Sequence, residues 1–334
     1  MQNKLLSQIV YETTLPVIMA PMFLVSGPQL VIEGCKAGII GSFPLLNART
    51  GDILEEWMRQ ITNELEQARI QEPNQKIAPW AVNFIVHRSN KRYEVDLELI
   101  KKYKPPIVIT SLGDPSQVVK IVHEYGGLVF SDVINLVHAR KAAEKGTDGL
   151  ILVSSGAGGH AGTYNPFAFI SAVKEFWNGI TILAGSISDG NDIVAAEALG
   201  ADFVYMGTRF IAAEESLTSK DYQNMLIDST IEDVIYTDAF SGVNANYLIP
   251  SIRKAGHDPD KLKKKAEMDF SKINQPGAKA WKDICSAGHG VHSIKKIQPV
   301  AEIVKELKQS YEKTLTHITA KHSQSSTLSE IKQE

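Results

Sequence analysis

The chain alternates between short, almost continuous apolar runs and longer segments in which apolar residues recur with a helical period. Eight apolar runs lie at 16–20, 37–43, 80–86, 106–110, 127–133, 149–155, 180–186 and 202–208. Runs of this length without polar alternation are typical of strands that are buried on both faces of a parallel sheet.

Amphipathic segments separate these runs and predict helices at 28–36, 52–71, 95–102, 116–124, 136–145, 166–176 and 189–199. Most of them begin after Asp, Ser or Pro, which suit the first turn of a helix. The eightfold alternation of strand and helix predicts an α/β fold of the (β/α)8 TIM-barrel type. A doubly wound open sheet is the alternative, but the segment VIMAPMFLVSG at the first strand lacks the glycine fingerprint of that fold.

The pattern changes after Arg209, where charged residues become frequent. We expect the barrel to occupy 1–212, a smaller and mainly helical cap domain to be inserted at 213–275, and the segment 276–318 to return to the barrel. Within the cap, only EDVIYTDAFSG reads as a strand candidate. An amphipathic helix is predicted from Pro299 to about Leu315, and the polar tail 319–334 is predicted to be disordered.

Charge and composition exclude several classes of function. The net charge of -3 gives no electrostatic reason to bind nucleic acid or an anionic membrane. No run of about 20 apolar residues is available to span a bilayer. The two cysteines, Cys35 and Cys285, are too few for a disulfide framework, and the N-terminus lacks the features of a signal peptide. We therefore expect a cytoplasmic protein, and the sequence leaves a homo-oligomer open.

Glycine and small hydroxyl residues follow the last two predicted strands. Gly185 and Ser186 come after the seventh strand, and Gly207 and Thr208 after the eighth. Such pairs leave backbone N–H groups open to an anion, and the loops after strands seven and eight of a barrel commonly bind phosphate. The sequence therefore favours a phosphate site there over two ordinary loops. Arg209 would either neutralise the phosphate or pair with an acid.

A histidine stands in a glycine-rich loop, SGAGGHAG, directly after the sixth strand. Gly158 and Gly159 would let the backbone approach a flat ligand closely, because they carry no Cβ. His160 has an ordinary pKa of about 6.5, so it can exchange a proton near neutral pH. We predict that His160 addresses a ligand; the alternative is a bond to a backbone carbonyl.

Two further groups have competing interpretations. Thr110 and Ser111 end the fourth strand and would either contact a ligand or cap the next helix. Cys285, His289 and His292 lie close in the sequence, as metal ligands do, but no second cluster accompanies them. We therefore predict no metal site.

Four motifs in this order resemble one known family. They are PVIMAPM, GAGGHAG, LAGSISDGNDIVAAEALGADFVYMGTRFIAAEES and WKDICSAGHGV. Over about residues 14–310 the sequence resembles the nitronate monooxygenases, formerly called 2-nitropropane dioxygenases, which are FMN-binding barrels. The resemblance implies an FMN cofactor and a catalytic role for His160.

The resemblance also implies where the cofactor binds. It places the phosphate at the loops after strands seven and eight and the flavin ring near the ends of the first, third and sixth strands: Ala20, Pro21, Met22, Asn83, Ser155, Gly158, Gly159, Gly185, Ser186, Met206, Gly207 and Thr208. Asn83 would bond a ring edge or tie two strands together. Two positions depart from the family pattern, because Ser155 stands where Gln or Lys is frequent and His289 stands where Gln is expected.

Three functions are compatible with these residues. The first is FMN-dependent oxidation of a small alkyl nitronate, or of a nitroalkane, with O₂ to a carbonyl compound and nitrite. His160 would then hydrogen-bond the anion or abstract the α-proton. The second is an FMN-dependent enoyl-thioester reductase that uses NAD(P)H. The third is a flavin-binding protein without catalytic turnover.

Overall fold

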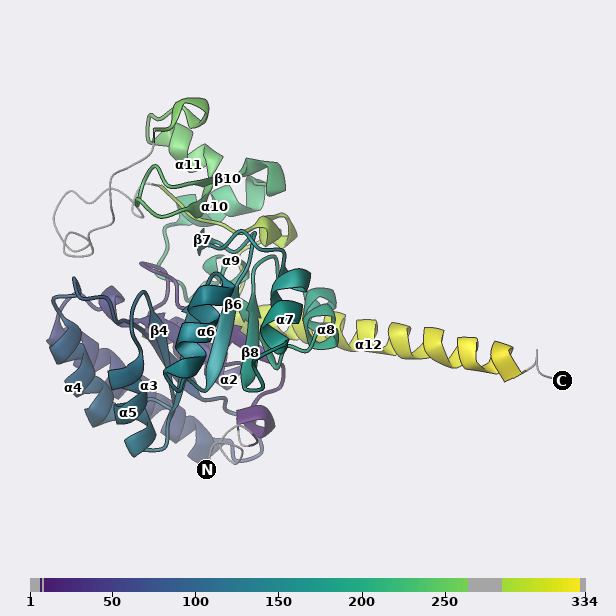
Figure 1. Ribbon diagram of the computed structural model, residues 1–334, viewed down its shortest axis with the longest axis horizontal. Helices are drawn as coiled ribbons and strands as arrows, with labels where there is room; N and C mark the ends of the chain where they lie inside the picture. Colours follow the sequence, from purple (N-terminus) through teal and green to yellow (C-terminus); the bar gives the residue numbers. More distant parts are fainter. Residues whose placement is uncertain (1–6, 8, 264–283, 331–334) are drawn as a thin grey trace.

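A computed structural model describes residues 7, 9–263 and 284–330 (Figure 1). Side chains are described for the same residues except 322–330. Eight parallel strands form the main sheet in the order β1-β9-β8-β6-β5-β4-β3-β2. A parallel bridge between Ile18 and Ile40 joins the two ends of this order and closes the barrel. The strands are β1 (Val17–Met19), β2 (Gly41–Pro44), β3 (Trp80–Ile85), β4 (Ile107–Ser111), β5 (Leu128–Val133), β6 (Gly149–Val153), β8 (Ile180–Ala184) and β9 (Phe203–Met206).

Helices surround these strands on the outside, as Figure 1 shows. They are α2 (Pro28–Lys36), α3 (Gly51–Gln71), α4 (Tyr93–Tyr103), α5 (Ser116–Glu124), α6 (Leu136–Glu144), α7 (Pro166–Lys174) and α8 (Gly190–Ala198). Side chains of Thr50, Asn135, Asn165 and Asp189 accept hydrogen bonds from the first-turn amides of α3, α6, α7 and α8, which explains where these helices begin. The predicted TIM barrel is confirmed.

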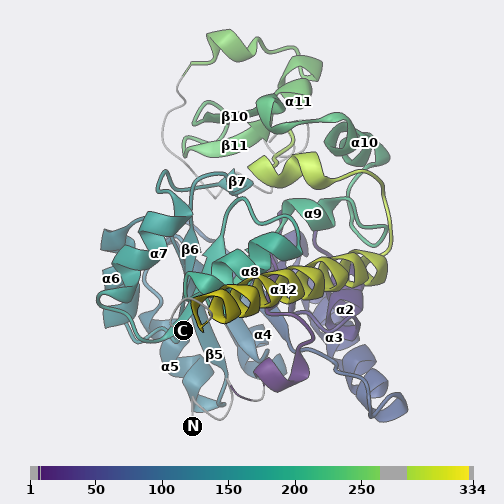
Figure 2. The same ribbon diagram turned by 90° about the vertical axis from the view of Figure 1, so that its right-hand side faces the viewer.

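The helix that completes the ring comes from the C-terminus. Helix α12 (Val300–Glu330) packs against α8 and α2, and Figure 2 shows it lying along the barrel wall. Val300, Ile303 and Leu307 bury its apolar face. The helix continues past the end predicted near Leu315, into the tail predicted to be disordered, because no Gly or Pro interrupts it. Residues 331–334 lie outside the described chain.

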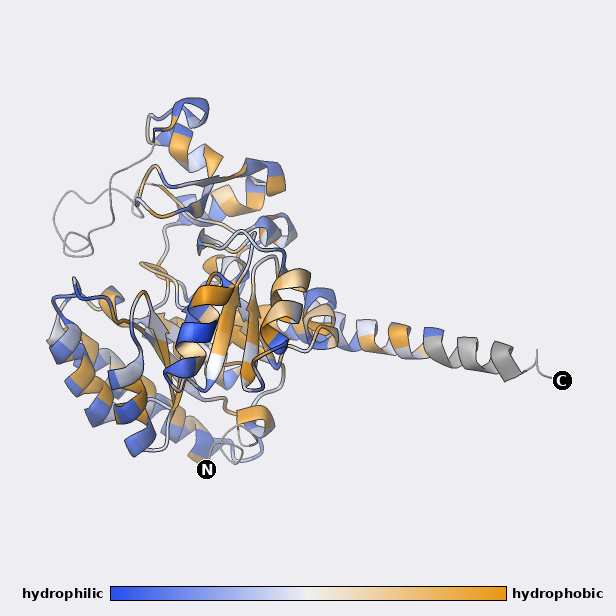
Figure 3. Cartoon of the chain, in the orientation of Figure 1, coloured by the Kyte–Doolittle hydropathy of each residue, from blue (hydrophilic) through white to orange (hydrophobic). Residues whose placement is uncertain are grey.

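The barrel interior is apolar over most of its depth and becomes polar at one end. Ile18, Ile109 and Ile182 are fully buried, and Figure 3 shows hydrophobic strands behind helices with polar outer faces. At the carboxyl ends of β3 and β4, however, Asn83 and Ser111 carry polar side chains. Chemistry in a barrel belongs at this end.

A smaller unit sits above that end of the barrel (Figure 1). It contains α9 (Thr208–Ile211), α10 (Lys220–Asp228), η2 (Ile231–Asp233), β10 (Val234–Thr237), β11 (Ala245–Leu248), α11 (Ile249–Lys254), η3 (Pro259–Lys261) and η5 (His289–Ser293). Strands β10 and β11 form an antiparallel sheet with β7 (Gly159–His160) from the glycine-rich loop.

Strand β10 lies within EDVIYTDAFSG, the one strand candidate of the cap, and β11 is a second strand that the sequence pattern did not predict. The sequence pattern missed β11 because it has four residues and a buried polar one, Asn246, among them. Part of the predicted cap, 264–275, lies outside the described residues. Among the helices that are described, none combines the length and apolar character needed to cross a bilayer.

Candidate functional site

A cavity of about 2090 Å³ lies between the carboxyl ends of the strands and the smaller unit. Most residues predicted for the site line it: Ala20, Pro21, Met22, Asn83, Gly158, Gly159, His160, Gly185, Ser186, Gly207 and Thr208. Ser155 and Met206 are not among the lining residues. Met206 is buried in the hydrophobic core, and its carbonyl accepts a hydrogen bond from the Ala20 amide at 2.9 Å.

The smaller unit holds the glycine-rich loop in place. Strand β7 pairs with β11, which sets His160 opposite Ala245. The Asn246 side chain donates to the Ala157 carbonyl at 2.7 Å, and the Tyr236 hydroxyl donates to the Ala161 carbonyl at 2.9 Å. The histidine is therefore positioned by an element that is remote from it in the sequence.

Hydroxyl groups of the smaller unit orient the His160 ring. Its Nε2 lies 3.3 Å from Ser241 Oγ, which donates to the Val243 carbonyl at 2.8 Å and accepts from the Tyr247 hydroxyl at 3.2 Å. Burial lowers the pKa of His160 to about 4, so the ring is neutral near pH 7.

The two loops predicted to bind phosphate have unusual backbone conformations. Gly185 has a φ of 110° and Ser186 a φ of 59°, and both residues face the cavity. No described residue accepts a hydrogen bond from the amides of Gly185, Ser186 and Gly207. A Cβ on Gly185 would lie 2.5 Å from Ser154 Oγ, so only glycine fits there.

The structure shows what Arg209 and Thr208 contact near these loops. Arg209 Nη2 pairs with Glu306 of α12 at 2.9 Å, whereas its buried Nη1 lacks a hydrogen-bond partner among the described residues, and Arg209 also lines the cavity. Thr208 Oγ1 accepts from the Gly288 amide at 2.9 Å and connects its loop to the C-terminal segment. The His289 ring packs beside Gly156, where an added Cβ would lie 2.8 Å from Nδ1.

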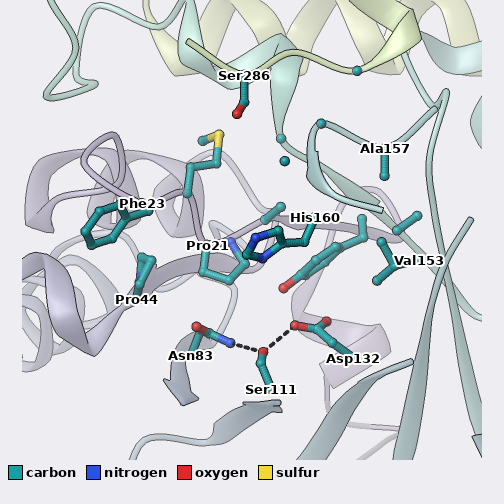
Figure 4. A pocket seen from close by; sticks show the side chains of 18 of the residues that line it. Pro21, Phe23, Pro44, Asn83, Ser111, Asp132, Val153, Ala157, His160 and Ser286 are labelled. Atoms are coloured by element: carbon teal, nitrogen blue, oxygen red, sulfur yellow. Dashed lines mark hydrogen bonds between the residues drawn. The ribbon is translucent and has the colours of Figure 1, made fainter. Parts of the chain in front are cut away.

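Three polar side chains form a hydrogen-bonded row at the ends of β3, β4 and β5 (Figure 4). Asn83 Nδ2 donates to Ser111 Oγ at 2.7 Å, and Ser111 Oγ donates to Asp132 Oδ2 at 2.5 Å. Asn83 also donates to the Ile109 carbonyl at 3.3 Å, so it does tie strands together while lining the cavity. Ser111 does not cap a helix, because α5 begins after Pro115.

Sequence reasoning missed Asp132 and Tyr205, which line the same cavity. Asp132 Oδ1 and the Tyr205 hydroxyl are buried and have no hydrogen-bond partner among the described residues. Burial raises the pKa of Asp132 to about 6, and the Ser111 hydroxyl opposes that shift. The available signal was an acid near the end of the apolar run 127–133, which a barrel places at its catalytic end.

The site is suited to a flat, polar-edged ligand with a phosphate. The row of amide, hydroxyl and carboxyl groups offers donors and acceptors to a ring, and the unengaged amides offer donors to an anion. Within the described part of the chain, no group of three or more His, Cys, Asp or Glu side chains could hold a metal ion.

Comparison with known proteins gives one family. The sequence pattern of the family described as "Nitronate monooxygenase" matches residues 3–310. A nitronate monooxygenase of Paraburkholderia phytofirmans is 26% identical, over 89% of this chain and 93% of that protein.

Solved structures show the same fold. A nitroalkane oxidase from Streptomyces ansochromogenes superposes with a TM-score of 0.78 at 22% identity, over 92% of this chain and 99% of that one. FabK from Thermotoga maritima superposes with a TM-score of 0.75 at 24% identity, over 94% and 98%. The family implies an oxidoreductase with a flavin cofactor.

Proposed function

Because this chain belongs to the nitronate monooxygenase family, we propose that it uses FMN to oxidise anionic alkyl nitronates with O₂ to carbonyl compounds and nitrite. The observation that carries this proposal is His160, a half-buried and neutral imidazole held at the edge of the cavity by a glycine-rich strand. A neutral N–H donor is suited to an anionic substrate, since it stabilises the charge without first giving up a proton.

The described residues fit FMN. The Gly185–Ser186 turn and Gly207 present amides without a protein acceptor, as a phosphate requires. Asn83, Asp132 and Tyr205 provide polar atoms for the edge of a ring, and two of those atoms are buried without a described partner. No dinucleotide fingerprint follows the first strand, which favours FMN over FAD.

The bound flavin would supply the electron chemistry, and the chain would supply orientation and electrostatics. Ser241 and Tyr247 fix the His160 ring, so its orientation is set before substrate arrives. A conjugate acid with a pKa of about 4 makes His160 a weak base toward a carbon acid. This favours a preformed nitronate over a neutral nitroalkane as the substrate.

A direct test begins with the purified protein. Denaturation should release a flavin with the mass of FMN, and anaerobic mixing with a nitronate should bleach its absorption. Aerobic turnover should then yield nitrite. Release of FAD would contradict the cofactor assignment, and a flavin that is inert to nitronates in the presence of O₂ would contradict the reaction.

An FMN-dependent enoyl-thioester reductase that uses NAD(P)H is the second candidate. The cavity favours it, because about 2090 Å³ exceeds the roughly 300–1,000 Å³ of ordinary small-molecule sites and could hold a longer substrate. The two functions separate in one experiment: rapid anaerobic bleaching by NADPH, with no response to nitronates, would establish the reductase.

A further inference from the structure

Asp132 is a buried carboxyl group with only half of its hydrogen-bonding capacity used. It ends the polar row that runs from Asn83 through Ser111, and it lines the cavity (Figure 4). Its Oδ2 accepts from Ser111, whereas its Oδ1 is buried without a partner among the described residues. A buried carboxylate oxygen left in this way costs free energy unless a ligand, a water or a proton satisfies it.

Among the described residues, Asp132 forms no ion pair that would hold it ionised. Ser111 of β4 contacts it directly, and the pKa of Tyr205 of β9 is raised by burial and by the charge of Asp132. His160 of β7 is neutral, and β6 contributes the apolar Val153 to the same cavity. Helix α6 and the residue that follows it add charged or titratable side chains to the cavity: His138, Lys141, Glu144 and Lys145.

We propose that Asp132 is a proton-exchanging group of the flavin site, whose carboxylate takes up a proton when negative charge arrives on the bound flavin. Ser111 and Asn83 are its positioning residues. The inference rests on the proposed FMN site, but not on the identity of the substrate. It follows from geometry, because an ionised carboxylate within one cavity with a reduced flavin would place two like charges in a medium of low dielectric constant.

The atoms and electrons balance in a titration with dithionite as the reductant. The flavin accepts two electrons and one proton, which gives a reduced ring with one negative charge. The Asp132 carboxylate then accepts a second proton from solvent and becomes neutral. Two electrons and two protons are therefore taken up together wherever Asp132 is ionised beside the oxidised flavin and protonated beside the reduced one.

The test is the midpoint potential of the FMN-loaded protein between pH 5 and 9. In the wild type, uptake of the extra proton should make the plot of midpoint potential against pH steeper by about 30 mV per pH unit, which for a two-electron couple is a tenfold change in the ratio of oxidised to reduced flavin. This steeper segment of the plot should begin near pH 6, where Asp132 titrates. The plot for Asp132→Asn should lack the steeper segment. At alkaline pH this variant should have a higher midpoint potential than the wild type, and the difference should correspond to at least a tenfold change in the ratio of oxidised to reduced flavin.

Two further variants keep the test decisive. Ser111→Ala removes the hydrogen bond that lowers the Asp132 pKa, so the steeper segment should begin at higher pH. Asp96→Asn is the matched control, because Asp96 is also a buried carboxyl with a pKa raised to about 6 but pairs with Arg92 away from the cavity. Its potential should follow the wild type.

The outcomes distinguish this proposal from the proposed function. If the wild type and Asp132→Asn show the same pH dependence, Asp132 does not exchange the proton, whatever the substrate proves to be. If Asp132→Asn fails to bind FMN, the Ser111→Ala variant decides. A steeper segment that begins at the same pH in Ser111→Ala as in the wild type would overturn the proposal. A wild type that shows the segment but does not oxidise nitronates supports Asp132 and contradicts only the reaction.

Discussion

At the scale of single residues, the chemistry of His160 is set by burial rather than by a charged partner. Desolvation lowers its pKa to about 4, and the hydroxyl of Ser241 orients the neutral ring. The same side chain in water would be partly protonated near pH 6.5. Its neutral state therefore belongs to the folded protein, with consequences for both turnover and stability.

The first consequence concerns substrate choice. His160→Asn should keep the flavin and should lower turnover on a preformed nitronate by about 10–100-fold, because a hydrogen bond to the anion is lost. A neutral nitroalkane should be a poor substrate for both proteins, because an imidazole with a pKa of about 4 is a weak base. Steady-state kcat/KM on both substrates measures the difference, and His138→Asn, an exposed histidine lining the same cavity, is the control. Unchanged rates on both substrates would make His160 structural.

The second consequence is sensitivity to acid. Between pH 6.5 and 4, an unfolded chain protonates this histidine and the folded one does not, so His160 contributes stability above pH 6.5 that is lost as the pH falls toward 4. Between pH 6.5 and 4, the free energy of unfolding of flavin-free His160→Asn should therefore fall by about 1–3 kcal/mol less than that of the wild type. Urea denaturation at several pH values measures it. The raised pKa of Asp132 changes the stability in the opposite sense, but Asp132 is present in both proteins and its contribution cancels in the comparison. The same pH dependence of stability in wild type and variant would contradict a desolvated, neutral His160.

At the scale of elements, the two loops proposed to hold the phosphate, after β8 and β9, differ in backbone geometry. Gly185 adopts a left-handed φ of 110° and packs against the strand-six loop, whereas Gly207 has an ordinary φ of -107°. A Cβ on Gly207 would meet Ala20 Cβ and Met22 Sδ at 3.5 Å, which is ordinary contact. Flavin binding and folding can therefore be separated by substitution.

Gly207→Ala and Gly185→Ala form a matched pair. We expect Gly207→Ala to change the free energy of unfolding of the flavin-free protein by less than about 0.5 kcal/mol, and Gly185→Ala to lower it by more than about 1 kcal/mol. Gly207→Ala should nevertheless weaken FMN binding by about tenfold, because Gly207 lines the cavity and the added methyl group would crowd a ligand held by its amide. Fluorescence titration of FMN measures the affinity. Full affinity in Gly207→Ala would place the phosphate elsewhere.

At the scale of the whole molecule, the fold is assembled from three parts of the chain. The barrel provides the strand ends, the segment after β9 provides β11 and Ser241, and α12 returns to complete the ring of helices. The first part of α12 packs against the barrel: Leu307 is buried, and the Tyr311 hydroxyl donates to Glu197 at 2.8 Å. Figure 1 shows the rest of the helix projecting away from the barrel.

Removal of residues 319–334 should therefore leave the barrel intact. Thr314 makes the contact to Asn191 just before the removed segment, so the packed part of α12 is retained. We expect the melting temperature to change by less than about 2 °C, since surface changes contribute within about 0.5 kcal/mol. Differential scanning calorimetry of the two proteins measures it. A larger decrease would show that the projecting helix packs against another copy or another part of the chain.

The amino-acid sequence by itself determined the barrel, because each buried strand is a local apolar run and each covering helix has a local period, to which α3, α6, α7 and α8 add a local side-chain cap. It also located the glycine loops and His160, since glycine and histidine are recognisable one residue at a time. The row of Asn83, Ser111 and Asp132 could not be predicted in this way, because three different strands contribute one residue each. Only the pairing of these strands in the barrel brings Asn83 Nδ2 within 2.7 Å of Ser111 Oγ, and Ser111 Oγ within 2.5 Å of Asp132 Oδ2. The neutral state of His160 was likewise decided by tertiary structure, since desolvation depends on what the rest of the chain places around a side chain.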